Sequence, residues 1–269
     1  LSRGLGDVYK RQGSSIEQKN RIRSVREHAM ITANQKKFVK SLAQKKFRKQ
    51  HCCFVIEGVK MVEEAIASDF TIKNIYASAE WIANNPGYDA EQVSNKELQQ
   101  LSFFKSPNEV MAVVKFKEIP YSDYNCKLTL ALDYVQDPGN LGTIIRTADW
   151  FGIDEIVCSN DSVDCFNPKV VQASMGSVFR VSVNYVDLSA FFEENKDLQV
   201  YGAKLDGEAL QNIQLNGKGS VILLGNESKG VSEKLNGYIT NSIAIEKLGG
   251  AESLNVASAA AILCYAFRS

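Results

Sequence analysis

Apolar and amphipathic stretches alternate regularly along the second half of the chain. Helical patterns separate several short apolar stretches that are predicted as strands: Leu128–Val135, Glu155–Asn160, Phe179–Val186, Leu198–Leu205, Ser220–Glu227 and Asn241–Leu248. These strands are apolar almost throughout instead of alternating with polar residues. The pattern predicts an α/β unit with a mostly parallel sheet that is covered on both faces.

A smaller α/β unit is predicted before it. Strand patterns at 52–58, 72–78 and 109–116 enclose helical patterns at 59–68 and 94–102, and Ser94 or Asn95 is the expected cap of the second helix. This unit offers no nucleophile, acid–base pair or metal cluster, so we expect it to serve recognition. The polar segment Lys117–Lys127 contains Pro120 and is the expected linker. The predicted domains are therefore residues 30–116 and 128–269, joined by the linker 117–127.

The first 29 residues do not fit either unit. They contain no apolar signal region, and "DVYKRQ" resembles the translated end of a transposon that is used to prepare sequencing libraries. Met30 is followed at once by a helical pattern. We therefore expect residues 1–29 to be a non-native leader and Met30 to be the native start.

Charge is distributed unevenly along a chain whose formal net charge is zero. Residues 126–269 carry 11 Lys and Arg against 17 Asp and Glu, a net of −6, whereas the segment 30–50 is basic without a single acid. Its seven cations are Lys36, Lys37, Lys40, Lys45, Lys46, Arg48 and Lys49. On charge alone they fit a helix that contacts the phosphates of a nucleic acid such as RNA, a role that needs support from other features. The alternative is a solvated helix whose apolar side, with Phe38, Leu42 and Phe47, docks on the domain.

Composition excludes several other classes of protein. No apolar run approaches the roughly 18–20 residues that span a bilayer, so no membrane association is expected. The six cysteines show no C-x-x-C spacing and the chain has two histidines, which predicts reduced core thiols in a cytoplasmic protein and no metal site.

Three loops that follow predicted strands carry the candidate chemistry, because ligands of parallel sheets bind at the carboxyl ends of strands. The first begins "DPGNLGTIIRTADWFG" at Asp137. Arg146 lies opposite the apolar face of the helix that follows, so it is free to meet an anion or a reacting hydroxyl, although an ordinary exposed arginine would look the same. A dinucleotide-binding oxidoreductase would need a third glycine in this loop, and that glycine is missing.

The other two loops are rich in glycine and small residues. "LLGNESKGVS" (Leu223–Ser232) has glycines at both ends, which allows a ligand close to the backbone. "IAIEKLGGAESLNVASAAAILCYAF" (Ile243–Phe267) places a Gly-Gly loop before a helix that is small or apolar on nearly every face. Such a helix needs cover on all sides, which predicts a symmetric homodimer through it.

"NLGTIIRTA", "LLGNESKGVS" and "ESLNVASAAA", in this order, resemble the three signature motifs of the SpoU (TrmH) family of RNA 2′-O-ribose methyltransferases in the SPOUT superfamily. The resemblance covers residues 128–269 and includes "NPKVVQASMGSVFR" between the first two motifs. Residues 30–116, with "FVIEGVKMVEEAI", resemble the ribosomal-protein-L30e-like substrate-binding domain of many members.

The resemblance implies a Rossmann-like α/β fold with a deep trefoil knot, an S-adenosylmethionine cofactor and a homodimer. It implies cofactor contacts at Gly225, Ile245 and Leu254, with Asn226, Gly230 and Val256 nearby. It implies that Arg146 acts on the ribose 2′-hydroxyl among Asn140, Glu227, Ser253 and Asn255. Gly142 is then expected to leave room beside Arg146 for a ribose-phosphate. Because arginine stays protonated, we expect Arg146 to orient the hydroxyl and stabilise developing negative charge more than to act as a base.

One departure and two alternatives accompany the resemblance. Glu246 stands where the family commonly has proline, which is expected to loosen the loop and to add an acid near the adenine site. Ribosomal RNA is the expected substrate over transfer RNA. A non-catalytic RNA-binding protein with a retained methyltransferase fold is the other alternative, and the polar residues named for the site speak against it.

Overall fold

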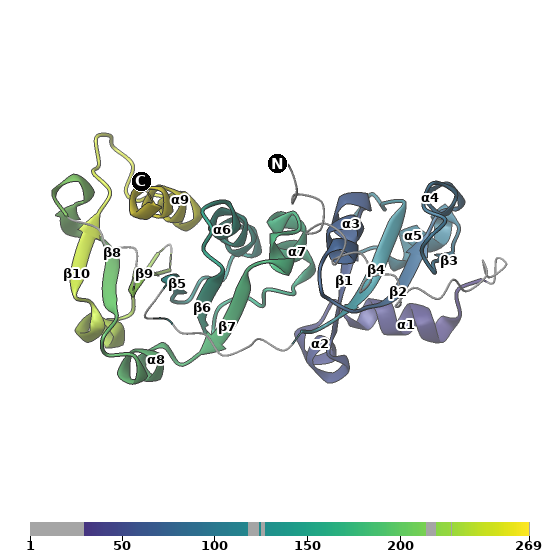
Figure 1. Ribbon diagram of the computed structural model, residues 1–269, viewed down its shortest axis with the longest axis horizontal. Coiled ribbons are helices and arrows are strands. Elements are labelled where there is room, and N and C mark those ends of the chain that lie inside the picture. Colours follow the sequence, from purple (N-terminus) through teal and green to yellow (C-terminus); the bar gives the residue numbers. More distant parts are fainter. Residues whose placement is uncertain (1–29, 118–123, 125–126, 214–218, 227, 269) are drawn as a thin grey trace, which may run out of the picture.

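The computed structural model describes residues 30–117, 124, 127–213, 219–226 and 228–268. The expected leader, most of the expected linker and Glu227 lie outside these residues. The chain forms two α/β units side by side, each built on its own sheet (Figure 1). We call them the four-stranded unit and the six-stranded unit.

The four-stranded unit has the strand order β1-β4-β2-β3, with β4 antiparallel to both of its neighbours. Its strands are β1 (Cys53–Glu57), β2 (Ile72–Ala77), β3 (Glu91–Gln92) and β4 (Val110–Lys115). Its helices are α1 (Ala33–Ser41), α2 (Lys45–His51), α3 (Val59–Ala67), α4 (Ala79–Asn84) and α5 (Asn95–Leu101). Both sheet faces are buried, because Phe54 and Ile56 of β1 pack with α3 while Cys53 and Val55 join the cluster under α1 and α5.

The basic segment forms two helices where the sequence suggested one. Thr32 caps α1 with a capping box, and the helix ends at Leu42. After a short turn, α2 begins behind Gln44 and ends at Cys52, which adopts the left-handed conformation. At the second predicted helix, Ser94 and not Asn95 is the cap, and Glu97 completes the capping box.

The six-stranded unit is parallel throughout, with the order β10-β8-β9-β5-β6-β7. Its strands are β5 (Leu128–Leu132), β6 (Glu155–Ser159), β7 (Ser182–Val186), β8 (Gln199–Ala209), β9 (Ser220–Leu224) and β10 (Asn241–Ala244). The parallel α/β sheet that the sequence predicted is therefore confirmed. The predicted strand at Phe179 starts later, because Ser177–Phe179 forms a 3₁₀ turn.

Helices cover both faces of this sheet. On one face α6 (Pro138–Trp150) lies between α7 (Pro168–Ser174) and α9 (Val256–Arg268), as Figure 1 shows. On the other face lie α8 (Leu188–Glu194) and the 3₁₀ helix η4 (Glu233–Tyr238). Alternate residues of β5 serve the two layers, since Leu130 packs toward α6 and Ala131 toward α8. A further 3₁₀ turn, Leu210–Asn212, follows β8.

The two units share a continuous interface. Phe166 of the six-stranded unit stacks on Phe54 and Phe116, at centroid distances of 4.3 and 4.7 Å. Arg180 forms ion pairs with Glu64 of α3 and Asp149 of α6. Apolar residues of α7 and the 3₁₀ turn after it join the α3-side core of the four-stranded unit. The two sheets are therefore held in a fixed relation, which matters for any ligand that contacts both.

The cysteines of the described chain are free thiols. Four are buried, in β1, in β6, in the loop after β6 and in α9, while Cys52 is exposed. Burial raises the pKa of Cys165 to about 12, and the neighbouring Asp164 charge adds to this effect. Buried thiols with such values stay protonated, in keeping with the predicted core role.

Candidate functional site

The loop after β5 fixes the start of α6. Asp137 caps the helix, since its Oδ1 accepts a hydrogen bond from the Asn140 backbone N–H at 2.8 Å, and Pro138 occupies the first turn. Asp133, which is buried, accepts hydrogen bonds from the Ser232 backbone N–H at 2.8 Å and from its hydroxyl at 2.6 Å. The loop after β5 is thereby tied to the end of the loop after β9.

The loop after β9 closes on itself. The Asn226 and Gly230 backbones exchange two hydrogen bonds, of 3.0 and 2.9 Å. A Cβ atom on Gly225 would lie 2.1 Å from the carbonyl carbon of Gly230, so this turn requires glycine at position 225. Asn226 holds the turn with its side-chain oxygen, which accepts from the backbone N–H groups of Ser228 and Lys229. Its side-chain nitrogen donates to the Tyr134 carbonyl at 3.0 Å and joins this loop to the first.

The loop after β10 reaches the same place from the edge of the sheet. Asn255 caps α9, because its Oδ1 accepts from the Ala257 N–H at 2.9 Å, and its Nδ2 donates to Asn140 Oδ1 at 2.8 Å. Ser253 and Leu254 are exposed beside it, Ile245 is half-buried, and Val256 is buried at the start of α9. Glu246 accepts a hydrogen bond from Gln211 at 3.1 Å.

The three loops named from the sequence thus lie together at the carboxyl ends of β5, β9 and β10. Asn140 and Asn255 are in direct contact, and Asn226 is bonded to the first loop. The structure brings these residues together without testing their roles. Glu227 lies outside the described residues.

Arg146 projects from the exposed side of α6, as its position opposite the apolar face predicts. Leu141, Ile144 and Ala148 on the opposite side are fully buried. In the described part of the chain no carboxylate forms an ion pair with Arg146. Arg146 stands six residues after Asn140, about 9 Å along the helix axis.

Gly142 does not serve the role expected of it. It is buried, and a Cβ atom there would lie 2.5 Å from the Cβ of Ala173 and 2.7 Å from the carbonyl oxygen of Val170. Its lack of a side chain lets α6 and α7 pack closely. The expectation that it leaves room for a ribose-phosphate is therefore wrong.

Arg48 corrects the prediction of a seven-cation RNA surface. Its side chain is 2% exposed, and its guanidinium donates to Asp164 and to the carbonyls of Leu42 and Ala43. A residue so enclosed cannot reach a phosphate, and Arg48 instead joins α2 to the loop after β6. Of the segment's apolar side, Leu42 is fully buried and Phe38 packs partly buried against the same core cluster, while Phe47 is half-buried.

The remaining cations of the segment lie at the surface or near it. Lys36 donates to Gln100, and Lys40 donates to the Ser102 carbonyl. The Lys45 ammonium lies 5.5 Å from the centre of the Tyr185 ring in the six-stranded unit. Lys37, Lys46 and Lys49 are exposed.

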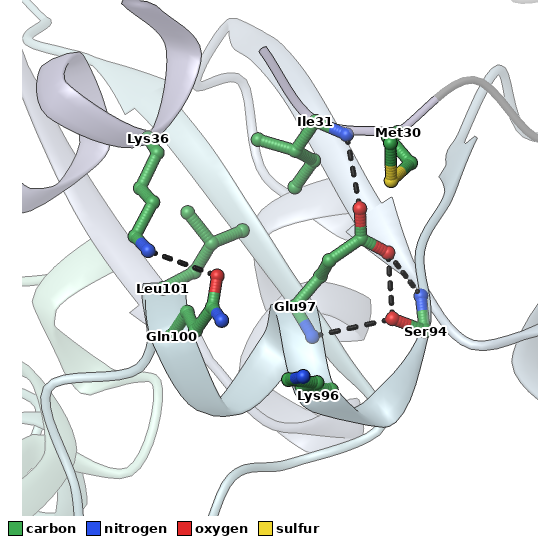
Figure 2. Close-up of a pocket in the computed structure, with 8 residues that line it drawn as sticks. All are labelled: Met30, Ile31, Lys36, Ser94, Lys96, Glu97, Gln100 and Leu101. Atoms are coloured by element: carbon green, nitrogen blue, oxygen red, sulfur yellow. Dashed lines mark hydrogen bonds between the residues drawn. The ribbon is translucent and has the colours of Figure 1, made fainter. Parts of the chain in front are cut away.

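A separate hollow of about 330 Å³ lies at the start of the four-stranded unit (Figure 2). Its lining comes from the chain ahead of α1 and from α1 and α5: Met30, Ile31, Lys36, Ser94, Lys96, Glu97, Gln100 and Leu101. The Glu97 carboxylate accepts from the backbone N–H groups of Ile31 and Ser94, at 3.0 and 2.8 Å. These contacts cap a helix and anchor the chain, and we assign no chemistry to this hollow.

Sequence reasoning missed residues that build the site. Asp133 and Ser232 connect the loop after β5 to the loop after β9, and Tyr134 makes a second connection between these loops through Asn226. An acidic residue directly after an apolar strand was the available signal for Asp133. Over the described ranges, no group of three His, Cys, Asp or Glu side chains could hold a metal ion. No helix in these ranges is long and apolar enough to cross a membrane.

Comparison with known proteins gives matches to both units. The model of the SpoU rRNA methylase family matches residues 127–265, and that of an MRM3-like substrate binding domain matches residues 34–112. The chain is 34% identical over 234 residues to 23S rRNA (guanosine(2553)-2′-O)-methyltransferase RlmP of Bacillus subtilis, covering 85% of this chain and 94% of that protein.

Solved structures agree over nearly the whole described chain. A TrmH-family protein from Porphyromonas gingivalis superposes with a TM-score of 0.81 at 38% identity, covering 89% of this chain and 99% of the other. An rRNA methyltransferase from Sinorhizobium meliloti, solved with bound S-adenosylmethionine, superposes with a TM-score of 0.78 at 29% identity, covering 89% and 97%.

Proposed function

Because the chain belongs to the SpoU rRNA methylase family, we propose that its three strand-end loops hold S-adenosylmethionine beside a ribose of ribosomal RNA. The chain is an S-adenosylmethionine-dependent RNA 2′-O-ribose methyltransferase. The observation that carries the assignment to these loops is the Asn140–Asn255 hydrogen bond at 2.8 Å, which joins the first and third motifs.

The loops suit the cofactor. Gly225 lets the turn close with two backbone segments in contact and no side chain between them, and Leu254, 47% exposed, offers an apolar surface for an adenine ring. Gly225, Ile245 and Leu254 would contact the cofactor, with Asn226, Gly230 and Val256 behind them. When bound, the cofactor supplies an electrophilic sulfonium methyl group.

Arg146 is the residue that we assign to the RNA. Its guanidinium orients the ribose 2′-hydroxyl and stabilises the negative charge that develops on that oxygen as it attacks. Asn140 and Asn255 hold each other and thereby fix the loop and helix on either side of the reacting group. Ser253 and Glu227 complete the proposed polar surroundings.

The role of Arg146 is tested by substitution. Arg146→Ala should lower methyl transfer to RNA by about 100-fold or more, because one preorganised donor to an oxyanion contributes that much. The methyl-transfer rate of Arg146→Lys should lie between those of Arg146→Ala and the wild type, since lysine keeps the positive charge but lacks the planar guanidinium. Binding of S-adenosylmethionine, measured by calorimetry, should stay near the wild-type value in both. Equal loss of cofactor binding would instead make Arg146 a structural residue.

We also infer a homodimer through α9 and the neighbouring end of α6. Trp150 is 84% exposed and Tyr265 is 63% exposed. The Tyr265 ring contacts the Phe151 ring edge to face, with 6.3 Å between the ring centres. The sequence predicted α9 to be apolar on all sides. In the monomer its outer face, with Ile262 and Tyr265, is open to solvent. Sedimentation should give twice the chain mass for the wild type and the chain mass for Tyr265→Glu.

A dimer would also allow the site to be completed by the second copy. A mixture of Arg146→Ala and Gly225→Ala, each inactive alone, should then regain part of the activity. If the mixture stayed inactive after subunit exchange, each active site would be formed by the residues of a single chain.

Three further proposals accompany the function. We propose that the segment from β9 to α9 forms a trefoil knot, because it travels to the edge strand β10 and returns to contact α6. We propose that residues 30–116 and 128–269 act as an RNA-binding and a catalytic domain, with Lys36, Lys37, Lys40, Lys45, Lys46 and Lys49 contacting phosphates. We place the enzyme in the cytoplasm with its ribosomal substrate.

Methyl transfer in vitro tests the function. Unmodified 23S rRNA, incubated with the protein and labelled S-adenosylmethionine, should yield one 2′-O-methylated nucleoside after nuclease digestion and mass spectrometry. Methylation of transfer RNA alone would redirect the assignment to that substrate. RNA binding without any transfer would indicate the non-catalytic alternative.

A further inference from the structure

Tyr134 adopts a backbone conformation that tyrosine rarely takes. Its φ angle is 59°, in the left-handed region, and it stands just after β5 in the loop that leads to α6. A side chain with a Cβ atom is disfavoured there, and a bulky one more so. The position therefore holds backbone strain that glycine would relieve.

The surroundings impose this conformation from several sides. Asp133 and Val135, its neighbours in the chain, are both buried. The Tyr134 backbone N–H donates to the hydroxyl of Ser159 at 2.8 Å, and its carbonyl accepts from Asn226 at 3.0 Å. The chain is thus pinned by the ends of β6 and β9 at once. Strain that is held in this way is typical of functional sites.

The result is an aromatic side chain at the surface of the site. Tyr134 is 36% exposed, while the residues on both sides of it face inward. The ammonium group of Lys229, from the loop after β9, lies 5.9 Å from the centre of the ring. An exposed ring with a cation beside it, next to the Asn226 turn, does not contribute to the core.

We propose that Tyr134 is a positioning residue for the RNA, on whose ring the base of the target nucleotide stacks, with Lys229 at the adjoining phosphate. This inference rests on the proposed function. Attack by a 2′-hydroxyl requires the nucleotide to be held in one orientation, and proteins hold unstacked RNA bases on aromatic rings. The strained loop keeps the ring in the open instead of letting it fold back onto the protein.

Substitutions separate the ring from the strain. Tyr134→Gly removes the ring and relieves the backbone, so its thermal midpoint should equal or exceed that of the wild type. Its kcat/KM should nevertheless fall about 5- to 150-fold, the range for loss of one base–aromatic stack, and mainly through KM. Tyr134→Asn, which tolerates the left-handed region without a ring, should behave alike. Tyr134→Phe should stay near wild type, and all three should bind S-adenosylmethionine normally.

A modified substrate distinguishes stacking from a structural effect. The assay uses a synthetic RNA oligonucleotide that spans the methylated site, and the same oligonucleotide with the target base removed. If the ring stacks on that base, wild type and Tyr134→Gly should have similar kcat/KM on the abasic RNA. If kcat/KM of wild type and Tyr134→Gly differed as much on the abasic RNA as on the intact RNA, the proposal would be contradicted.

The inference and the proposed function fail in different ways. An active wild-type enzyme whose Tyr134→Gly variant is equally active would overturn the inference alone. A wild-type protein that methylates no ribosomal RNA would overturn the proposed function, and the inference with it.

Discussion

The contact between Arg48 and Asp164 makes a quantitative prediction about the docking of the two units. The Asp164 Oδ2 atom accepts from Arg48 Nε at 2.9 Å and from Nη2 at 2.5 Å, across 116 positions of sequence. The Asp164→Asn substitution removes the negative charge with little change in shape. The Arg48 guanidinium then keeps its two carbonyl partners but no counter-charge.

The size of the effect follows from burial. The side chains of Arg48 and Asp164 are 2% and 13% exposed, so water cannot solvate the charge that remains. Removing one partner of such a pair lowers the free energy of unfolding by about 3–5 kcal/mol. For Asp164→Asn we expect a loss of about 3 kcal/mol, because the asparagine side chain still offers one oxygen as an acceptor. The exposed pair of Lys117 and Asp69 is the matched control, and Asp69→Asn should leave stability unchanged.

Urea unfolding measures this loss. In a Trp150→Phe background the remaining tryptophan is Trp81, which is buried in α4, so its fluorescence reports on the four-stranded unit, while circular dichroism reports on the whole chain. In Asp164→Asn, the unfolding midpoints measured by both signals should shift to a lower urea concentration. The double variant Arg48→Met with Asp164→Leu should regain most of the stability, because no charge is left buried. A loss below about 1 kcal/mol in Asp164→Asn would show that the Arg48 charge does not depend on Asp164 for its stabilisation.

Three further predictions concern packing, pH and the cofactor loop. Gly142→Ala should destabilise the protein by about 1–3 kcal/mol, because the added Cβ would lie 2.5 Å from an atom of α7. Gly237 has open space around it, so Gly237→Ala should leave the stability nearly unchanged. Thermal unfolding measures both variants. Burial of Asp149 opposes its ionisation, but hydrogen bonds led by that from Arg180 lower its pKa below the ordinary 3.8. The Asp149 carboxylate should therefore stabilise the protein fully above pH 3.8, and this stabilisation should be lost as the pH falls through the lowered pKa of the folded state. Asp149→Asn should be less stable than the wild type at about pH 7, and the two should be equally stable once the wild-type carboxylate is protonated. Gly225→Ala should abolish calorimetric binding of S-adenosylmethionine, because its Cβ would meet the backbone of the same loop at 2.1 Å; normal binding would remove that loop from the cofactor site.

The sheet and the meeting of the three loops could be predicted because they follow from pattern alone. Continuous apolar strands separated by helices fix a parallel sheet, and parallel strands bring their carboxyl ends to one edge. The resemblance to the family's motifs, and not the pattern, grouped Asn140 with Asn255, 115 positions further along the chain, and these two side chains share a hydrogen bond. The exposed side of α6 at Arg146 followed from helical periodicity.

Other features depend on contacts that no local pattern records. Arg48 looks like its basic neighbours in the sequence, and what buries it is Asp164, which lies in the other unit. Gly142 looks like an opening beside Arg146, but the neighbour that requires it is α7. The left-handed conformation of Tyr134 is imposed by Ser159 at the end of β6 and by Asn226 in the loop after β9.

Ribose-methylation mapping of total RNA, with and without the gene, tests the assigned activity most directly. Deletion should remove one 2′-O-methyl site in 23S rRNA, and the wild-type gene, but not Arg146→Ala, should restore it. A methylation map that is unchanged by the deletion would contradict the account.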